Sequence, residues 1–147
     1  MSDFLVSPCN SLSGVITIPG DKSISHRAIM MGSIANGVTK VSGFLEGNDS
    51  LATLKSFQKM GVGIDRSGSN LTINGVGIHG LNAPTKPLNL GNSGTSIRLM
   101  SGLLSAQSFD SELCGDQSLS KRPMDRIIEP LRQMGAKIYG VNSKPPL

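Results

Sequence analysis

The sequence predicts an α/β (α+β) protein made of two copies of a βαβαββ module. Short β-branched apolar runs alternate with longer segments whose apolar residues recur at helical spacing. The sequence also repeats itself: residues 56–64 align with 130–138, and 23–35 align with 94–106, at offsets of 74 and 71. Two matches at nearly one offset favour an internal duplication with modules of roughly 70 residues. Eighteen glycines among 147 residues favour frequent turns over a helical bundle.

The first module carries helix and strand signals in the required order. Its first helix has Ile24, Ala28, Met31 and Ala35 at helical spacing, which predicts an apolar face. Its last two strands form a hairpin, because alternating segments flank the turn sequence Ser-Gly-Ser-Asn. The predicted elements are a strand at 14–18, a helix over 23–35 ended by Gly37, a strand at 39–44, a helix capped by Asn48 or Asp49 and ended by Gly61, and a hairpin over 62–76.

The second module repeats this order and stops inside its hairpin. Its last helix is predicted to start at Pro123, with a kink or a tightened turn where Pro130 interrupts the helical pattern. The apolar stripe of that helix contains Met124, Ile127, Ile128 and Leu131. The predicted elements are a strand at 86–90, a Gly-rich turn and helix over 91–107, a strand at 109–115, a helix over 122–135 and the start of a hairpin over 136–147. A module of this type needs one more strand, so we expect the chain to be a fragment of a longer protein.

Composition excludes several classes of protein. The net charge of +4 is mild, basic residues are scattered and aromatics make up only 3%, so nucleic acid is not an expected partner. Cys9 and Cys114 match neither a metal-site spacing nor a disulfide framework. We see no signal peptide, and no apolar run reaches the roughly 20 residues that span a membrane. We therefore expect a soluble cytoplasmic protein with no membrane partner.

The stretch "PGDKSISHR" (19–27) is the first candidate site. A strand, a Pro-Gly turn and a helix start follow one another, and the free N–H groups of a helix start favour anions. Lys22 adds a point charge and Arg27 a planar fork suited to phosphate or carboxylate. A nucleotide P-loop is excluded because Asp21 separates the glycine from the lysine. The alternative is an ordinary capped helix with solvated basic residues.

Two further strand-to-helix turns carry anion-suited residues. "GNSGT" (91–95) combines flexible glycines with short polar side chains, and Lys121 and Arg122 precede Pro123. Each could be a plain turn, but three such turns in one chain favour a shared anion site. For His26 a structural or surface role is favoured over acid–base chemistry, and His79 has no partners. The acidic residues form no catalytic pair.

Three stretches carry a family resemblance that covers essentially the whole chain. They are "PGDKSISHRAIMMGSIANG", "LNLGNSGTSIRLMSGLL" and "GDQSLSKRPMDRIIEPLRQMGAKI". In order, spacing and module type the chain resembles the 5-enolpyruvylshikimate-3-phosphate synthase family. The resemblance implies about two of the family's six modules, from the N-terminal third. It also implies that residues 1–20 belong with the family's other domain, and that 21–147 form a partial domain lacking its third module.

The resemblance implies transfer of the enolpyruvyl group of phosphoenolpyruvate to the 5-hydroxyl of shikimate 3-phosphate, with release of phosphate. Lys22 matches the lysine that contacts both substrates and is the catalytic candidate in this chain. Ser23 and Arg27 match ligands of shikimate 3-phosphate. The matches to phosphoenolpyruvate ligands are Lys22, Asn92, Gly94, Thr95 and Arg122. The family's acid and base groups, an Asp, a Glu and a Lys, are expected mostly in the other domain.

Further expectations follow from the resemblance. No cofactor and no metal are implied, the full-length enzyme is expected to be a monomer, and a chain of only these residues is expected to be inactive. Gly94 stands where some relatives have alanine, which implies sensitivity to the phosphonate analogue glyphosate. Two alternatives stay open: a UDP-N-acetylglucosamine enolpyruvyl transferase, and a non-catalytic anion-binding repeat module.

Overall fold

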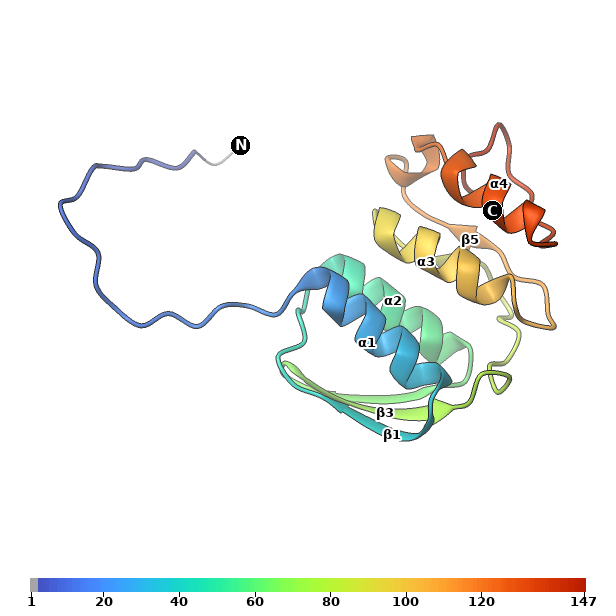
Figure 1. The fold of residues 1–147 in the computed structure, drawn as a ribbon, viewed down its shortest axis with the longest axis horizontal. Helices are drawn as coiled ribbons and strands as arrows, with labels where there is room; N and C mark the ends of the chain where they lie inside the picture. Colours follow the sequence, from blue (N-terminus) through green and yellow to red (C-terminus); the bar gives the residue numbers. More distant parts are fainter. Residues whose placement is uncertain (1–2) are drawn as a thin grey trace.

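A computed structural model describes residues 3–147 and shows an extended N-terminal arm, residues 3–20, joined to a folded body (Figure 1). The helices are α1 (Lys22–Ile34), α2 (Asn48–Lys59), α3 (Gly94–Leu104) and α4 (Asp125–Gln133), with the short 3-10 helix η1 (Leu119–Lys121) before α4. The strands are β1 (Asn36–Val41), β2 (Gly63–Ser67), β3 (Asn70–Val76), β4 (Leu88–Asn89) and β5 (Leu113–Cys114). The mixture of helices and strands confirms the predicted fold class.

The first module places α1 and α2 side by side over an antiparallel sheet of order β1-β3-β2 (Figure 1). The predicted hairpin is confirmed, because Ser67 pairs with Asn70 across a two-residue turn. Gly68 in that turn has a φ of 54°, a left-handed conformation that glycine adopts without steric cost. Strand β3 turns Leu71 and Ile73 inward, 2% and 0% exposed, so the sheet closes the module beneath its helices.

The second module repeats the pairing of the first at the predicted offset. Leu113 of β5 and Leu147 exchange two backbone hydrogen bonds of 2.9 and 3.0 Å, and Val141 bridges Lys144 in antiparallel fashion. The equivalent pairs of the first module, 74 residues earlier, are Thr39–Ile73 and Ser67–Asn70. The start of a second hairpin is therefore confirmed. The other pairing in this module is parallel, between β4 and β5.

One buried cluster joins the two modules. It contains Phe57 of α2, Ile73 of β3, Ile97 of α3 and Ile128 of α4, each at most 1% exposed. Helix α3 lies between the α1–α2 pair and α4 (Figure 1), so its apolar face is covered from both modules. Full burial of a large apolar side chain contributes about 1.5–3 kcal/mol, which makes this shared core the main force that holds the modules together.

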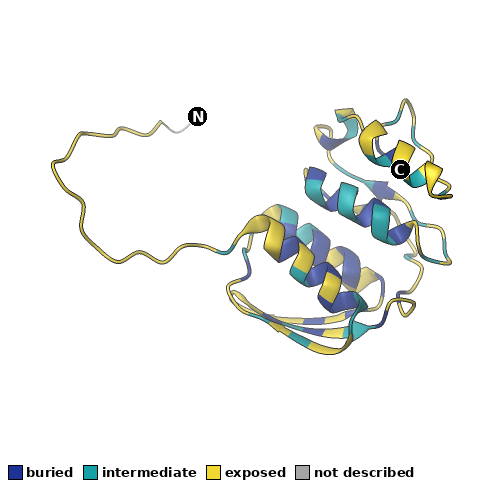
Figure 2. Cartoon of the chain, viewed as in Figure 1, coloured by how far each residue is buried: buried dark blue, intermediate teal, exposed yellow. Residues whose placement is uncertain are grey.

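The predicted strand at 14–18 does not form in the described residues. Residues 3–20 contain no helix or strand, and the arm is exposed along its length (Figure 2). Val15, Ile16 and Ile18 are between 73% and 100% exposed. A strand needs a neighbour to bond its backbone, and this segment has none within residues 3–147. The arm ends at Gly20, where an added Cβ would lie 1.9 Å from the carbonyl oxygen of Gly43.

The predicted apolar face of α1 is wrong. Ile24 and Met31 are 68% and 64% exposed, whereas Ile29 and Met30 are buried together with the polar face of the helix. Gly32 allows this orientation, since an added Cβ there would lie only 3.0 Å from the side chain of Ile73. The helix therefore approaches the sheet through small residues. Of the four evenly spaced apolar residues, the two large ones stay exposed and the two alanines are half-buried.

Helix α4 begins at Asp125 and not at the predicted Pro123. Arg122 is extended, with φ −79° and ψ 132°, because a residue before proline is driven out of the helical region. The helix continues through Pro130 to Gln133. In the predicted stripe Met124 and Ile128 are buried and the other two residues are half-buried, so the stripe is confirmed in outline.

Candidate anion-binding site

A cavity of about 290 Å³ opens where the starts of three helices meet. Lys22 begins α1, Asp49 lies in the first turn of α2, and Gly94 begins α3. Its lining residues are Lys22, Asp49, Asn92, Gly94, Thr95, Arg98 and Arg122. The structure thus brings the five predicted phosphoenolpyruvate ligands together from three sequence stretches that are far apart.

Side-chain caps fix two of these helix starts. Asp21 accepts a 2.7 Å hydrogen bond from the Ile24 N–H, and Ser93 accepts one of 3.1 Å from the Ser96 N–H. These caps each satisfy one of the four free N–H groups of a helix start and leave others pointing outward. The positive end of each helix dipole then faces the cavity, an arrangement that favours an anion.

Three cations and one carboxylate give the cavity a positive balance. Lys22 Nζ lies 3.0 Å from Asp49 Oδ2, but the lysine side chain is 51% exposed, so this ion pair contributes at most about 1 kcal/mol. Arg98 donates to the Gly94 carbonyl oxygen at 3.0 Å, and Arg122 donates to Asn92 Oδ1. Both guanidinium groups are thereby held over the start of α3. The cavity is suited to a small, multiply charged anion.

The other two predicted ligands lie outside this cavity. Ser23 and Arg27 are exposed on α1, where Arg27 Nη1 donates to the Ser23 carbonyl oxygen at 3.2 Å. Together with Lys22 they form a solvent-facing corner, which we call the α1 corner. Because the α1 corner and the cavity share Lys22, this lysine is placed to contact ligands in both.

Two lining residues were missed by the sequence analysis. Arg98 aligns with Arg27 in the internal repeat, and in the structure each arginine reaches back to the carbonyl oxygen four residues earlier. The repeat alignment was therefore a signal that could have found Arg98. Asp49 was considered only as a helix cap, and no motif separated it from other capping residues. Lys121, predicted beside Arg122, is exposed and does not line the cavity.

His26 lies directly beneath the site with no exposed surface. Its Nδ1 atom lies 2.9 Å from Thr53 Oγ1. Burial lowers the pKa of His26 below its ordinary value of 6.5; nearby Asp49 opposes this shift, and Lys22 and Arg27 add to it. The imidazole is therefore neutral at pH 7, which supports the structural role over the surface role. His79 is exposed, as expected for a loop residue.

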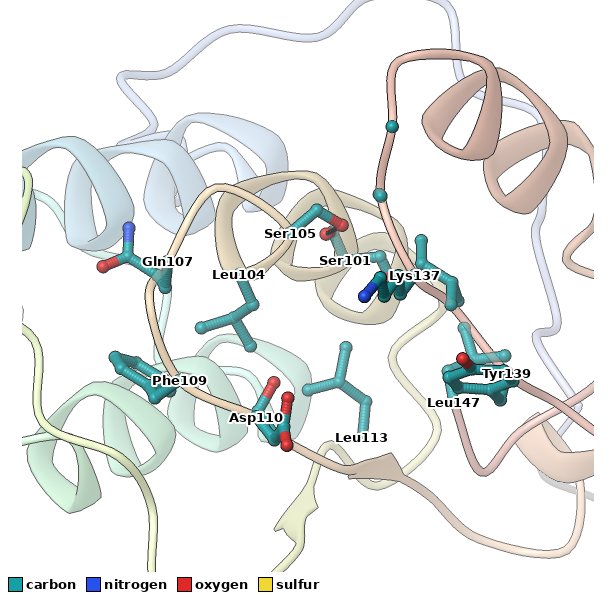
Figure 3. A pocket seen from close by; sticks show the side chains of 14 residues that line it. Ser101, Leu104, Ser105, Gln107, Phe109, Asp110, Leu113, Lys137, Tyr139 and Leu147 are labelled. Atoms are coloured by element: carbon teal, nitrogen blue, oxygen red, sulfur yellow. Dashed lines mark hydrogen bonds between the residues drawn. The ribbon is translucent and has the colours of Figure 1, made fainter.

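A second cavity of about 660 Å³ lies in the second module (Figure 3). Apolar side chains, including Leu104 and Leu113, point into it. Ile138 also lines it, and the equivalent residue of the first module, Ile64, is buried against the completed hairpin. This cavity is therefore the partly open core of the second module. It lacks the convergent cations of the first cavity and is not our candidate site.

Other candidate sites receive no support in the part of the chain that the structure describes. No group of three or more metal-ligating side chains occurs in residues 3–147. Cys9 is exposed and Cys114 half-buried, and neither is in a disulfide. None of the described helices is long and apolar enough to cross a membrane.

Two related α/β modules, with a cationic cavity where their helices start, are the features expected for part of an enolpyruvyl transferase fold. The chain belongs to the EPSP synthase (3-phosphoshikimate 1-carboxyvinyltransferase) family, whose model matches residues 6–147. The description of this family names the shikimate enzyme and not UDP-N-acetylglucosamine enolpyruvyl transferase, which was the first of the two open alternatives.

Relatives and solved structures agree with this assignment. The 3-phosphoshikimate 1-carboxyvinyltransferase of Ruthia magnifica is 68% identical over 147 residues, which is 100% of this chain and 34% of the relative. That of Vesicomyosocius okutanii is 64% identical over the same share. EPSP synthase from Acinetobacter baumannii superposes with a TM-score of 0.86 at 60% identity, over 90% of this chain and 31% of that one. The chain thus spans about a third of the length of the relatives it matches.

Proposed function

We propose that this chain forms part of a 3-phosphoshikimate 1-carboxyvinyltransferase. The complete enzyme would transfer the enolpyruvyl group of phosphoenolpyruvate to the 5-hydroxyl of shikimate 3-phosphate, giving 5-enolpyruvylshikimate 3-phosphate and phosphate. The observation that carries the proposal is the cationic cavity at three helix starts, built from the three stretches that carry the resemblance. The reaction belongs to the shikimate pathway, which leads to chorismate and the aromatic amino acids, and we place it in the cytoplasm.

The two neighbouring anion-binding regions suit two substrates. We assign phosphoenolpyruvate to the cavity, where Arg122 offers a planar fork beside the backbone of Gly94. We assign shikimate 3-phosphate to the α1 corner, with Ser23 and Arg27 as its ligands. Lys22 lies between them and contacts both. The position of Lys22 in the first turn of α1, with its ammonium group at the cavity, supports this division.

The cations of the site would offset the repulsion between two substrates that are both multiply charged anions. Holding them together lowers the entropic part of the barrier, and fixed positive charge stabilises the transition state without reorganisation. The reaction also requires protonation of the enol carbon and removal of the hydroxyl proton. We propose that the carboxylates and the lysine for these steps come mainly from the family's other domain. Residues 1–20 would pair in that domain, which fits the exposed apolar side chains of the arm.

The test is phosphate release by the full-length protein that contains this chain, with phosphoenolpyruvate and shikimate 3-phosphate supplied together. Release that depends on both substrates is expected. Neither substrate alone should give it, and residues 1–147 alone should give none, because they hold only half of the site. Binding without turnover by the full-length protein would favour the non-catalytic anion-binding module instead. Turnover by residues 1–147 alone would refute the division of the site between two domains.

A further inference from the structure

Buried polar groups beneath the cavity form one connected chain across three helices. His26 of α1 places Nδ1 2.9 Å from Thr53 Oγ1 of α2, which lies 2.7 Å from Ser96 Oγ of α3. Ser96 Oγ donates to Ser93 Oγ at 2.5 Å, and Ser93 is the N-cap of α3. All four side chains belong to residues with 0% exposure. We call this set the His26 chain.

The His26 chain lies one helical turn below the cavity. Lys22 lines the cavity four residues before His26, and Asp49 lines it four residues before Thr53. On α3 the two cavity-lining residues at the helix start lie between the two serines of the chain. Residues four apart on a helix stand on the same face. The chain therefore links the three helix starts immediately behind the surfaces that they present to a ligand.

The hydroxyl protons give the chain a direction. Ser96 has one hydroxyl proton and donates it to Ser93, so it accepts from Thr53. Thr53 Oγ1 lies 3.4 Å from the Asp49 carbonyl oxygen but only 2.7 Å from Ser96 Oγ. The threonine hydroxyl therefore donates to Ser96 and accepts from His26. With this direction of donation His26 carries its proton on Nδ1, an atom that also lies 3.4 Å from Ser96 Oγ. Its Nε2 atom has no partner within residues 3–147, and as a bare nitrogen it leaves no buried N–H donor unsatisfied.

We propose that His26, Thr53 and Ser96 are positioning residues that hold the start of α3 against α1 and α2 and thereby set the affinity of the cavity for phosphoenolpyruvate. The inference rests on the proposed function. An anion held by groups of three helices requires those groups at hydrogen-bond distance simultaneously, and a displacement of about 1 Å is enough to weaken it strongly. The residues of the α1 corner all belong to one helix, so the affinity of this corner for shikimate 3-phosphate does not depend on the position of α3.

Thr53→Val is the sharpest test, because valine keeps the shape of threonine and lacks the hydroxyl. In the full-length protein we expect the KM for phosphoenolpyruvate to rise at least about fivefold, as expected when a buried hydrogen-bond chain is cut. The KM for shikimate 3-phosphate should change less than about twofold, because the α1 corner is untouched. Thr53→Ser restores the hydroxyl and should restore the KM. A variant that merely destabilised the protein would lower the active fraction without this split between substrates.

Two further variants and one NMR spectrum also test the positioning role of the His26 chain. Ser96→Ala cuts the chain on another helix, carries the same expectation and decides the matter if Thr53→Val does not fold. His26→Asn places an amide near Nδ1 and should retain more phosphoenolpyruvate affinity than His26→Ala. Nitrogen-15 NMR of the unmodified protein should show His26 as the Nδ1–H tautomer. The matched control is Ser33→Ala, which removes a buried α1 hydroxyl with no partner among the described residues and should leave both KM values unchanged.

The outcomes separate this inference from the proposed function. If the unmodified protein releases no phosphate, the proposed function fails, and a titration with phosphoenolpyruvate decides the inference. Weaker binding by Thr53→Val than by the unmodified protein then supports it, and equal binding overturns it. If the protein is active, an unchanged KM for phosphoenolpyruvate, an equal rise in both KM values, or an Nε2–H tautomer overturns it.

Discussion

A methyl group at Gly94 should crowd the cavity without disturbing the fold. An ideal Cβ at this position would lie 2.7 Å from Nη1 of Arg122 and 2.7 Å from Nη1 of Arg98. Ordinary van der Waals contact begins at about 3.4 Å, so each guanidinium group would have to withdraw by about 0.7 Å. Both are ends of flexible side chains and can move. The backbone of Gly94 is helical, so alanine is tolerated there and gains up to about 1 kcal/mol of helix propensity.

The withdrawal has a calculable effect on phosphoenolpyruvate. Arg98 now donates to the Gly94 carbonyl oxygen at 3.0 Å, so the two side chains are held close to the helix start. A hydrogen bond to a charged group contributes about 1.5–3 kcal/mol, and 1.4 kcal/mol is a factor of ten. Loss of one guanidinium contact to the ligand therefore predicts a rise of about 10- to 100-fold in the KM for phosphoenolpyruvate in Gly94→Ala. The inhibitory concentration of glyphosate should rise as well, since we propose that it occupies the same cavity.

The assay is phosphate release by the full-length protein at varied phosphoenolpyruvate and saturating shikimate 3-phosphate, with and without glyphosate. Gly102→Ala is the matched control, because it lies in the same helix and an added Cβ there meets no atom within 4 Å. It should leave the KM unchanged, and neither variant should lower Tm. A KM within twofold of the unmodified protein in Gly94→Ala, or an equal change in Gly102→Ala, would refute the reasoning.

Three more predictions follow from burial and charge. Burial lowers the pKa of His26 below 6.5, so the unfolded state binds more protons than the folded state just below that pH. The contribution of His26 to the free energy of unfolding should therefore be constant above about pH 6.5 and fall as the pH is lowered further. Urea unfolding at several pH values measures this, and His26→Asn should lose that part of the pH slope. Phe57→Ala removes a fully buried ring and should lower the free energy of unfolding by about 3–5 kcal/mol, with a loss below 1 kcal/mol contradicting its place in the core. Arg122→Lys keeps the charge and loses the planar fork, so the KM for phosphoenolpyruvate should rise about tenfold, and an unchanged KM would remove Arg122 from the site.

Local signals in the sequence were sufficient where backbone geometry decides the structure. The turn at Gly68 and the helix end at Gly61, both with positive φ, were located from glycine and its neighbours. The sequence also predicted the start of a second hairpin, which the structure confirms at the Val141–Lys144 bridge, equivalent to Ser67–Asn70 of the first. These features depend on few residues that are close together in the chain.

Packing across elements was harder to predict. Helix α1 carries evenly spaced apolar residues, yet it buries Ser25, His26 and Ser33 and exposes Ile24. Periodicity shows that a helix has faces, but it does not show which face another element covers. His26 is buried with a partner on α2, and Ser25 bonds backbone groups at 2.7 and 3.0 Å, whereas Ser33 has no partner among residues 3–147. No single segment contains that information.

The sequence predicted most residues of the candidate site, but only the structure shows which of them lie together in space. The cavity collects Lys22, Asn92 and Arg122 because each precedes or begins a helix, and the helix starts converge. Ser23 and Arg27 belong to the same motif as Lys22 but are exposed and do not line the cavity. Their separation depends on a rotation of about 100° per residue around α1, which spreads one short motif over two surfaces.

The N-terminal arm meets the folded body at a close backbone approach between Gly20 and Gly43. There is no room for even a methyl group at this joint, so the backbone of Gly20 is wedged against its neighbour immediately before the cap of α1. Only Asp21 separates this close contact from Lys22, the first residue of α1. Any side chain at position 20 would therefore have to displace the backbone two residues before the lysine that lines the cavity.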